Sequence, residues 1–255
     1  MINDINVNGV NLWKYVDDTS MAETVHKGQP SGIQVAVDEL VRQAETDKFQ
    51  LNETKCKELQ ISFSRSADSF EAVTINNKPI EVVTSVKLLG LTISNNLKWN
   101  AHIENVIKKG ASGLYQLRQL KRAKGDPAQL VCFYTTCIRF VTEYTIPAFY
   151  NALPLYLKNK HLRIEKGSIF IITAGDCAVA QDLGIRPLLE HYEFLCQKLF
   201  KGILDNPSHK LKALLPPTHK PSYNFKNKRH FNMPRLRTSR TMNTFIFAMA
   251  RKFNG

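Results

Sequence analysis

Short apolar runs separated by turn residues fill the first third of the chain. The run at 12–16, rich in aromatic and β-branched residues, stops at Asp17-Asp18 and is followed by a second run at 21–25, which predicts a β-hairpin. Apolar residues then recur with the spacing i, i+4, i+7, i+8 and i+11 from Ile33 to Ala44. This periodicity predicts a helix, with Ser31 as its N-cap.

Three further runs, at 59–63, 72–75 and 86–93, are typical of strands, with turn signals at 76–79 and 95–96. The order is a hairpin, a helix and then more strands. We therefore expect an α+β fold, with helices on one face of a sheet, rather than a doubly wound parallel sheet.

The pattern becomes helical after Trp99. Apolar positions from Ile103 to Leu120 predict one long amphipathic helix, and Asp126-Pro127 is a strong start signal for the next. We predict helices at 127–143, 155–173, 187–204 and 242–253, arranged as a bundle with short loops. Four prolines between 216 and 234 predict an extended surface segment.

The charge of the chain is strongly positive and unevenly spread. The formal net charge is +13 and the sequence pI is near 9.5, which indicates a polyanionic partner such as nucleic acid or an anionic membrane. Residues 1–60 carry ten acidic and six basic side chains, whereas residues 206–255 carry eleven basic and no acidic ones. The two ends of the chain are therefore expected to do different work.

The sequence also bears on location. No apolar run is long enough to span a membrane, and the N-terminus lacks the pattern of a secretory signal. We expect a soluble, intracellular protein of the cytoplasm or nucleus with no membrane partner, and the oligomeric state stays open. The five cysteines form no Cys-x-x-Cys pair, and no two of the seven histidines lie three or four residues apart, so free thiols and no zinc site are expected.

The pair Asp17-Asp18 is the strongest candidate for chemistry. Two adjacent carboxylates at the tip of an apolar hairpin repel each other, and a divalent cation such as Mg²⁺ relieves that repulsion. In two-metal sites, the ions activate the attacking oxygen and stabilise the leaving oxygen. The alternative is an ordinary polar turn whose side chains cap their own backbone.

Several motifs in order along the chain carry a resemblance to a known family. Tyr15-Val16-Asp17-Asp18 is similar to the Tyr-x-Asp-Asp box of reverse transcriptases, and Leu51-Asn52-Glu53-Thr54-Lys55 resembles the element that follows the box in non-LTR retrotransposon enzymes. Residues 86–93 resemble the primer-grip hairpin of these enzymes. The resemblance implies a partial palm at 1–98, thumb-like helices at 99–150 and a helical, basic C-terminal region at 151–255.

The resemblance implies RNA-directed DNA synthesis from deoxynucleoside triphosphates on an RNA template and a DNA primer. Asp17 and Asp18 would bind the catalytic metal, Lys55 would protonate the departing pyrophosphate, and Tyr15, Leu89 and Gly90 would position the primer. For Lys55 the alternative is a solvated lysine. For Leu89 and Gly90 it is strand packing with a bulge glycine.

The reverse transcriptases that this chain resembles carry a further metal-binding aspartate, and their fingers, upstream of the box. Only sixteen residues precede Asp17 here. We therefore expect a fragment that is inactive alone, extends no primer with Mg²⁺ or Mn²⁺, and binds Mg²⁺ only when the missing region completes the site.

Basic residues form two clusters with a function of their own. Arg118, Lys121, Arg122 and Lys124 lie close together, and Lys228, Arg229, Arg235 and Arg237 are interleaved with aromatic residues. Lys and Arg contacts to phosphates, combined with aromatic stacking, are typical of RNA and single-strand binding. A non-enzymatic nucleic-acid-binding protein is therefore the competing hypothesis to the polymerase, and a solvated basic face is the alternative for each cluster.

Overall fold

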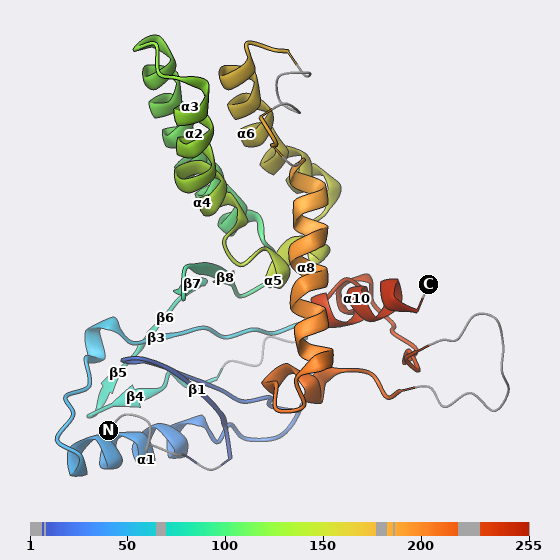
Figure 1. Cartoon of the computed structure of the whole chain (residues 1–255). Helices are drawn as coiled ribbons and strands as arrows, with labels where there is room; N and C mark the ends of the chain where they lie inside the picture. Colours follow the sequence, from blue (N-terminus) through green and yellow to red (C-terminus); the bar gives the residue numbers. More distant parts are fainter. Residues whose placement is uncertain are drawn as a thin grey trace, which may run out of the picture. The chain divides into compact units, whose positions relative to one another are not determined.

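The chain divides into two compact units, Met1–Lys98 and Trp99–Gly255. A computed structural model describes residues 7, 9–64, 70–176, 183–185, 187–218 and 230–254. It combines helices with small two-stranded sheets (Figure 1). In the described part of the chain, no helix is long and apolar enough to cross a membrane.

The core of the first unit forms around helix α1 (Ile33–Thr46). Ala36 and Leu40 pack with Val7, whereas Val37 packs with Val73 and Ile75. The apolar periodicity of this segment therefore predicted both the helix and its buried side. The predicted N-cap Ser31 lies one residue too early, because the helix is capped at Gly32, although the Ser31 hydroxyl still accepts a hydrogen bond from the Ile33 amide at 3.3 Å.

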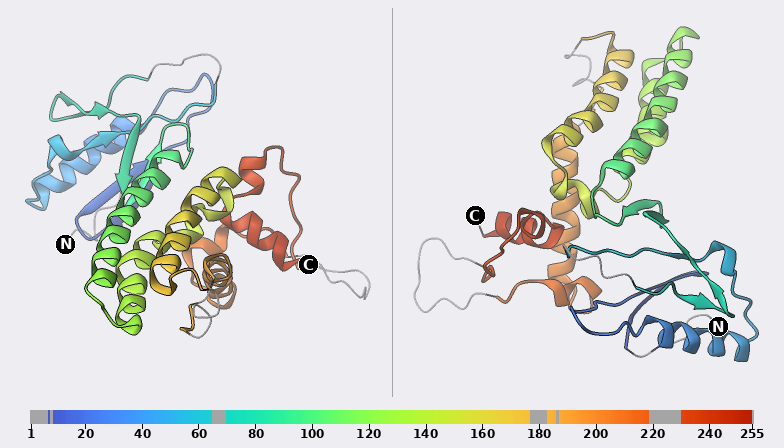
Figure 2. Two further views of the ribbon diagram at one scale, coloured as in Figure 1. Left: turned by 90° about the horizontal axis from the view of Figure 1, so that it is seen from above. Right: turned by 180° about the vertical axis from the view of Figure 1, so that it is seen from behind.

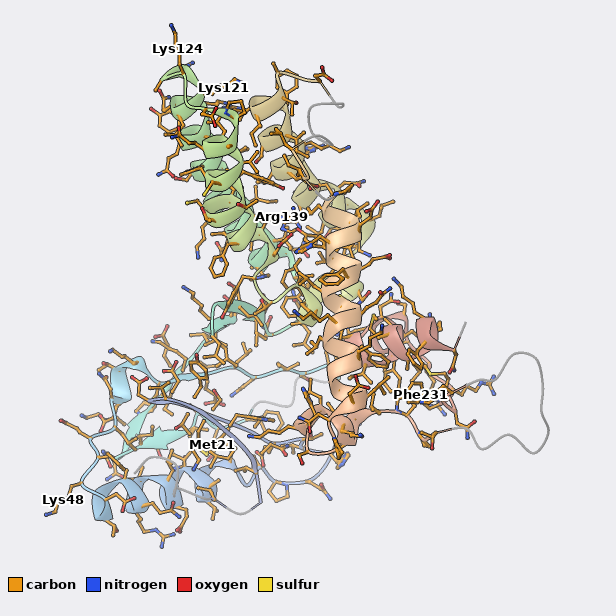
Figure 3. All side chains as sticks on the ribbon, viewed as in Figure 1. Met21, Lys48, Lys121, Lys124, Arg139 and Phe231 are labelled. Carbon is orange, nitrogen blue, oxygen red and sulfur yellow. The ribbon has the colours of Figure 1, made fainter. Side chains whose placement is uncertain are left out.

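Two contacts join α1 to the strands of its unit. The side-chain amide of Gln34 donates to the backbone carbonyl of Thr74 at 3.0 Å and accepts from the backbone amide of Thr74 at 2.8 Å. It thus pairs with Thr74 in the way that the backbone of a neighbouring strand would. Met21 packs against both clusters on α1, and Figure 3 shows this side chain. Together these contacts hold the helix against the otherwise sparse strands.

Every sheet among the described residues has only two strands. β3 (Lys57–Glu58) pairs in parallel with β6 (Glu81–Val82), and β4 (Thr74–Ile75) pairs antiparallel with β5 (Lys78–Pro79). The predicted strand at 59–63 is wrong, and the one at 72–75 shrinks to two residues. Ile61 and Phe63 are exposed, and no strand of the described chain pairs with their backbone.

Two hairpins complete the first unit. β1 (Asn11–Tyr15) pairs with β2 (Asp18–Ala22), so the second strand begins three residues earlier than predicted. β7 (Ser85–Leu88) pairs with β8 (Leu91–Ser94), which divides the predicted run at 86–93 into two strands. Apolar patterning alone does not mark such a tight turn, because the turn includes a leucine.

The second unit is built on two long helices, α2 (Asn100–Arg122) and α6 (Leu155–Thr173). They run side by side in the same direction, as Figures 1 and 2 show. Asn100 at the start of α2 donates to the Tyr156 hydroxyl at 2.8 Å, and Lys121 near its end donates to the Ile172 carbonyl at 3.0 Å. Both C-terminal ends therefore lie together.

A continuous helical rod packs along α2. It consists of α3 (Pro127–Phe133), the π-helical segment η3 (Tyr134–Arg139) and α4 (Phe140–Glu143). The predicted start at Asp126-Pro127 is confirmed: the Asp126 carboxylate accepts from the Ala128 amide at 3.0 Å, and the Gln129 side chain completes a capping box.

The other helices in the described part of the second unit are α5 (Ile146–Phe149), α8 (Leu188–Asp205), α9 (Ser239–Met242) and α10 (Phe245–Phe253). Short 3-10 turns lie at η4 (Tyr150–Ala152) and η5 (Lys210–Leu214). An aromatic cluster of Phe200, Phe231, Phe245 and Phe253 joins α8 to the C-terminal helix. The predicted helix at 242–253 is interrupted between α9 and α10.

Phe231 is a buried residue within the segment at 216–234, for which the sequence predicted a surface-wrapping or extended course. The Phe231 side chain is 2% exposed, and its backbone forms a β-bridge with Thr218. Figure 3 labels this side chain. The Asn254 side chain accepts from the Phe231 amide at 2.8 Å and donates to the Phe231 carbonyl at 2.9 Å. Both sides of the segment are therefore anchored, and its middle, 219–229, lies outside the described residues.

Gly113 on α2 should not tolerate a side chain. A Cβ at this position would lie 2.7 Å from Cγ1 of Ile138, a buried β-branched side chain in η3. We expect Gly113→Ala to lower the free energy of unfolding by about 1–3 kcal/mol, because overpacking outweighs the better helix propensity of alanine. Urea unfolding followed by circular dichroism measures the change.

Gly202 on α8 is the matched control. A Cβ at this position meets no atom within 4 Å. Gly202→Ala should therefore raise the free energy of unfolding by about 0.5–1 kcal/mol through helix propensity alone. Equal effects of the two substitutions would contradict the close packing on α2.

Candidate nucleic-acid interface

The shared C-terminal end of α2 and α6 forms a basic hollow of about 420 Å³. Its lining residues are Arg118, Lys121 and Arg122 from α2, and Gly167, Phe170, Ile171 and Ala174 from α6 and the turn after it. We call this site the α2–α6 hollow. The structure therefore joins three of the four residues of the first predicted basic cluster to an apolar wall that was not predicted.

The three cations differ in what they already bind. Lys121 donates to the Ile172 carbonyl at the end of α6, so part of its capacity is used within the fold (Figure 3). Arg118 and Arg122 are exposed. Among the residues that the structure describes, no acidic side chain lines the hollow. An anion that enters the α2–α6 hollow would lie near the side chains of Arg118 and Arg122.

The fourth residue of the cluster, Lys124, adopts a strained backbone conformation. Its φ is 58°, in the left-handed region that glycine normally occupies after a helix. The turn is closed by a hydrogen bond from the Gly125 amide to the Leu120 carbonyl at 3.0 Å. Lys124 is exposed at the tip beyond α2 (Figure 3). Lys124 therefore adopts a backbone conformation in which a glycine would be more stable.

The second predicted basic cluster is only partly visible. Arg235 and Arg237 are exposed in the segment before α9 and do not line the α2–α6 hollow. Lys228 and Arg229 lie outside the described residues. The predicted aromatic partner Phe231 is buried in the aromatic cluster, so it does not offer a stacking surface.

The predicted metal site lies on the tip of the β1–β2 hairpin. Asp17 and Asp18 are both exposed, and Tyr15 is 61% exposed at the end of β1. In the described chain, no group of three or more His, Cys, Asp or Glu side chains could hold a metal ion. Two exposed carboxylates do not form the ligand set of a divalent cation, so Mg²⁺ binding stays a prediction that needs further ligands.

The other predicted catalytic and primer-binding residues take ordinary surface positions. Lys55 is exposed at the end of the 3-10 turn η2 (Glu53–Lys55). Leu89 and Gly90 form the tight turn between β7 and β8, with φ of 45° and 84°. These two residues therefore turn the chain and are not strand residues with a bulge.

The charge of the chain is concentrated in the second unit. Residues 99–255 carry twenty-five basic and nine acidic side chains, whereas residues 1–98 carry ten basic and thirteen acidic ones. The unit that holds the α2–α6 hollow therefore carries the net positive charge of the chain, and the unit that holds Asp17 and Asp18 has a small negative net charge.

A group of buried and partly buried polar side chains lies between η3, α4, α6 and α8. Arg139 Nε donates to Glu143 Oε1 at 2.6 Å, and His191 Nε2 lies 3.2 Å from the other oxygen of Glu143. Tyr134 donates to Glu165 Oε1 at 3.5 Å. Burial raises the pKa of Glu165 to about 7, despite the nearby Arg139 guanidinium.

His161 is the counterpart of Glu165 on the same helix. It is 1% exposed, and its Nδ1 lies 3.2 Å from the Tyr192 hydroxyl. Burial lowers the pKa of His161 to about 4. Both side chains therefore favour their neutral forms. They belong to the packing of the second unit and do not line the α2–α6 hollow.

Phe170 is the residue of the α2–α6 hollow that the sequence did not single out. It lies in the most apolar stretch of the chain, 168–174, and a run of this kind is usually core. The available signal was its position on α6 relative to Arg163 and Lys166, which lie seven and four residues before it. All three side chains are exposed, so Phe170 belongs to the polar face of its helix.

Comparison with known proteins gives a match to a family model. Residues 99–139 match the family model described as alkylated DNA repair protein alkB homolog 8, N-terminal. The match spans α2, α3 and η3, and it includes Arg118, Lys121 and Arg122. No curated protein and no solved structure matches the chain.

This match corrects the family predicted from the motifs. The matched model is not a reverse transcriptase family, so the identification as a reverse transcriptase fragment of a non-LTR retrotransposon is wrong. The RNA-directed DNA polymerase activity and the nucleotidyltransferase and retrotransposon assignments fall with it. The roles of Asp17, Asp18 and Lys55 came from that resemblance and lose its support.

The opposite shifts of Glu165 and His161 predict how stability depends on pH. Between about 4.5 and 7 the folded Glu165 holds a proton that the unfolded chain releases, so its contribution to the free energy of unfolding falls as pH rises. Between about pH 6.5 and pH 4, His161 stays unprotonated in the folded chain but binds a proton in the unfolded chain. Its contribution to the free energy of unfolding therefore falls as the pH decreases. The two slopes oppose each other from 4.5 to 6.5.

Glu165→Gln removes one slope and leaves the other. We expect the free energy of unfolding of this variant to rise with pH between 4.5 and 6.5 by up to about 1.4 kcal/mol per pH unit relative to the unaltered chain. Urea unfolding at a series of pH values measures it. The exposed Glu104→Gln should reproduce the unaltered profile, and a Glu165→Gln profile of the same shape would contradict the assigned pKa shift.

Proposed function

We propose that this chain is a non-enzymatic nucleic-acid-binding protein, and that its second unit holds the ligand. The observation that carries the proposal is the α2–α6 hollow, which Arg118, Lys121 and Arg122 line together with the exposed Phe170. Guanidinium and ammonium groups beside an aromatic surface are the usual means of binding a nucleic-acid backbone and its bases.

Two further observations support this proposal. The charge of the second unit, twenty-five basic against nine acidic side chains, supplies the long-range attraction that such binding needs. The family model that matches 99–139 is described by the name of a DNA repair protein, and the matched residues supply the three cations of the hollow.

The competing explanation is that the cations serve only the helix ends. Positive side chains near a helix C-terminus stabilise it by about 0.3–1 kcal/mol each. This accounts for Lys121, which binds a carbonyl of α6. It accounts less well for Arg118, a full turn before the end of α2. The two explanations differ in whether a nucleic acid binds, which a direct measurement decides.

Binding by the full chain should depend steeply on salt. We expect Arg118→Gln combined with Arg122→Gln to weaken binding of a labelled oligonucleotide and to make the slope of log affinity against log salt shallower by about 1.4, for two lost phosphate contacts. Fluorescence anisotropy at several salt concentrations measures both effects.

The matched control removes the same charge elsewhere in the second unit. Lys198 and Lys201 are exposed on α8 and do not line the α2–α6 hollow. The variant Lys198→Gln with Lys201→Gln should keep a steeper slope than the arginine variant. An affinity of the unaltered chain that stays flat from low to moderate salt would refute the proposal.

Lys124 should lower the stability of the fold through its backbone conformation and strengthen nucleic-acid binding through its charge. We expect Lys124→Gly to raise the free energy of unfolding by about 1 kcal/mol, because glycine accepts the left-handed backbone, and to weaken oligonucleotide binding by removing a charge. Lys48, with φ of 59° after α1 in the first unit, is the charge-matched control. Lys48→Gly should stabilise the chain and leave oligonucleotide binding unchanged; equal binding losses in both variants would count against a role for the Lys124 charge.

A further inference from the structure

Phe170 is much more exposed than nearby residues of the same apolar stretch. Its ring is 65% exposed, whereas Ser168 and Ile172 on the same helix are 0% and 2% exposed. Covering an exposed phenyl ring stabilises a contact because apolar surface is removed from water. In the described part of the chain, most of the Phe170 side chain stays uncovered in the α2–α6 hollow.

The ring is supported on one side by the turn that follows α6. Gly175 has a φ of 94°, and a Cβ at this position would lie 3.2 Å from Cε2 of Phe170. The bare backbone of Gly175 therefore lets the turn approach the ring closely. A ring that has a backbone turn close to one edge and is 65% exposed is suited to stacking against a flat apolar group.

The charges around the ring define which flat group fits. Arg118 and Arg122 line the same hollow, and no carboxylate of the described part of the chain does. A flat ring carried on a chain of phosphates matches both features, because the ring covers Phe170 while the phosphates pair with the guanidinium groups. An uncharged aromatic ligand would leave the arginines unused.

An unpaired base meets this description, and a duplex does not. In a duplex the faces of the bases are covered by their neighbours in the stack, so Phe170 reaches them only after unstacking, which costs a few kcal/mol. The volume of about 420 Å³ is in the range of small-ligand sites, about 300–1,000 Å³.

We infer that the α2–α6 hollow binds single-stranded nucleic acid, with one unpaired base stacked on Phe170 and its flanking phosphates held by Arg118 and Arg122. The inference rests on the proposed function and adds to it the class of ligand and the residue that selects it. RNA and DNA strands share this chemistry, and both are used in the test.

The test compares single-stranded RNA, single-stranded DNA and the DNA duplex of one mixed sequence, each bound to the full chain and followed by fluorescence anisotropy. We expect at least one single strand to bind more tightly than the duplex. Phe170→Leu should weaken single-strand binding by about 5- to 100-fold, as expected for the loss of one stacked base, and should leave duplex binding unchanged.

Two variants protect the result against unfolding and nonspecific effects. Phe140 is 66% exposed on α4 and does not line the α2–α6 hollow, so Phe140→Leu should bind as the unaltered chain does. Phe170→Trp keeps a stacking surface and should retain single-strand binding, with its added fluorescence quenched when the strand binds. Circular dichroism verifies that each variant is folded.

The outcomes separate the inference from the proposed function. Salt-sensitive binding that is equal for single strands and duplex, and is unaffected by Phe170→Leu, overturns the inference and leaves the proposed function standing. Equal losses in Phe170→Leu and Phe140→Leu also overturn it. If no nucleic acid binds at low salt, the proposed function fails, and the inference fails with it.

Discussion

The close packing of α2 against its neighbours is the constraint on which the second unit depends. Gly110 and Gly113 leave room for Ile164 of α6 and Ile138 of η3, each within 3 Å of where a Cβ would lie. Because α6 approaches α2 this closely and runs in the same direction, the two helices finish together. The three cations from one helix and the aromatic ring from the other then face a single hollow. A basic cluster that looked local in the sequence is thus one half of a site.

The helical elements could be predicted because their determinants are local. The apolar spacing from Ile33 to Ala44 and the capping pair Asp126-Pro127 act within one or two turns of the chain. The strands could not be predicted as well, because a strand needs a partner, and the run at 59–63 has none in the described chain. The basic residues of the hollow were recognisable by type. Phe170 was hidden, since an apolar residue in an apolar stretch gives no sign of which face it occupies.

The family could not be read from short motifs. Tyr15-Val16-Asp17-Asp18 and the leucine-rich stretch at 86–93 consist of residue types that hairpins favour for their own reasons. In the structure, Leu89 and Gly90 form a tight turn with positive φ at both positions, and Asp17 and Asp18 are exposed near a turn. Local backbone requirements therefore account for part of a pattern that resembled a catalytic one. The family model matches residues 99–139, which include Gly110 and Gly113 at the close contacts of α2.

The π-helical segment has a consequence for how the rod from 127 to 143 is ordered around its axis. A π-helical turn holds about one residue more than an α-helical turn, so the residues that follow are rotated relative to those before it, by about 100° for each residue of mismatch. Arg139 and Glu143 are thereby turned toward His191, while Phe140 between them faces solvent. The orientation of the Arg139–Glu143 ion pair thus depends on the extra residue in the π-helical turn. A helical wheel drawn with α-helical spacing over 127–143 would place this pair on a different face.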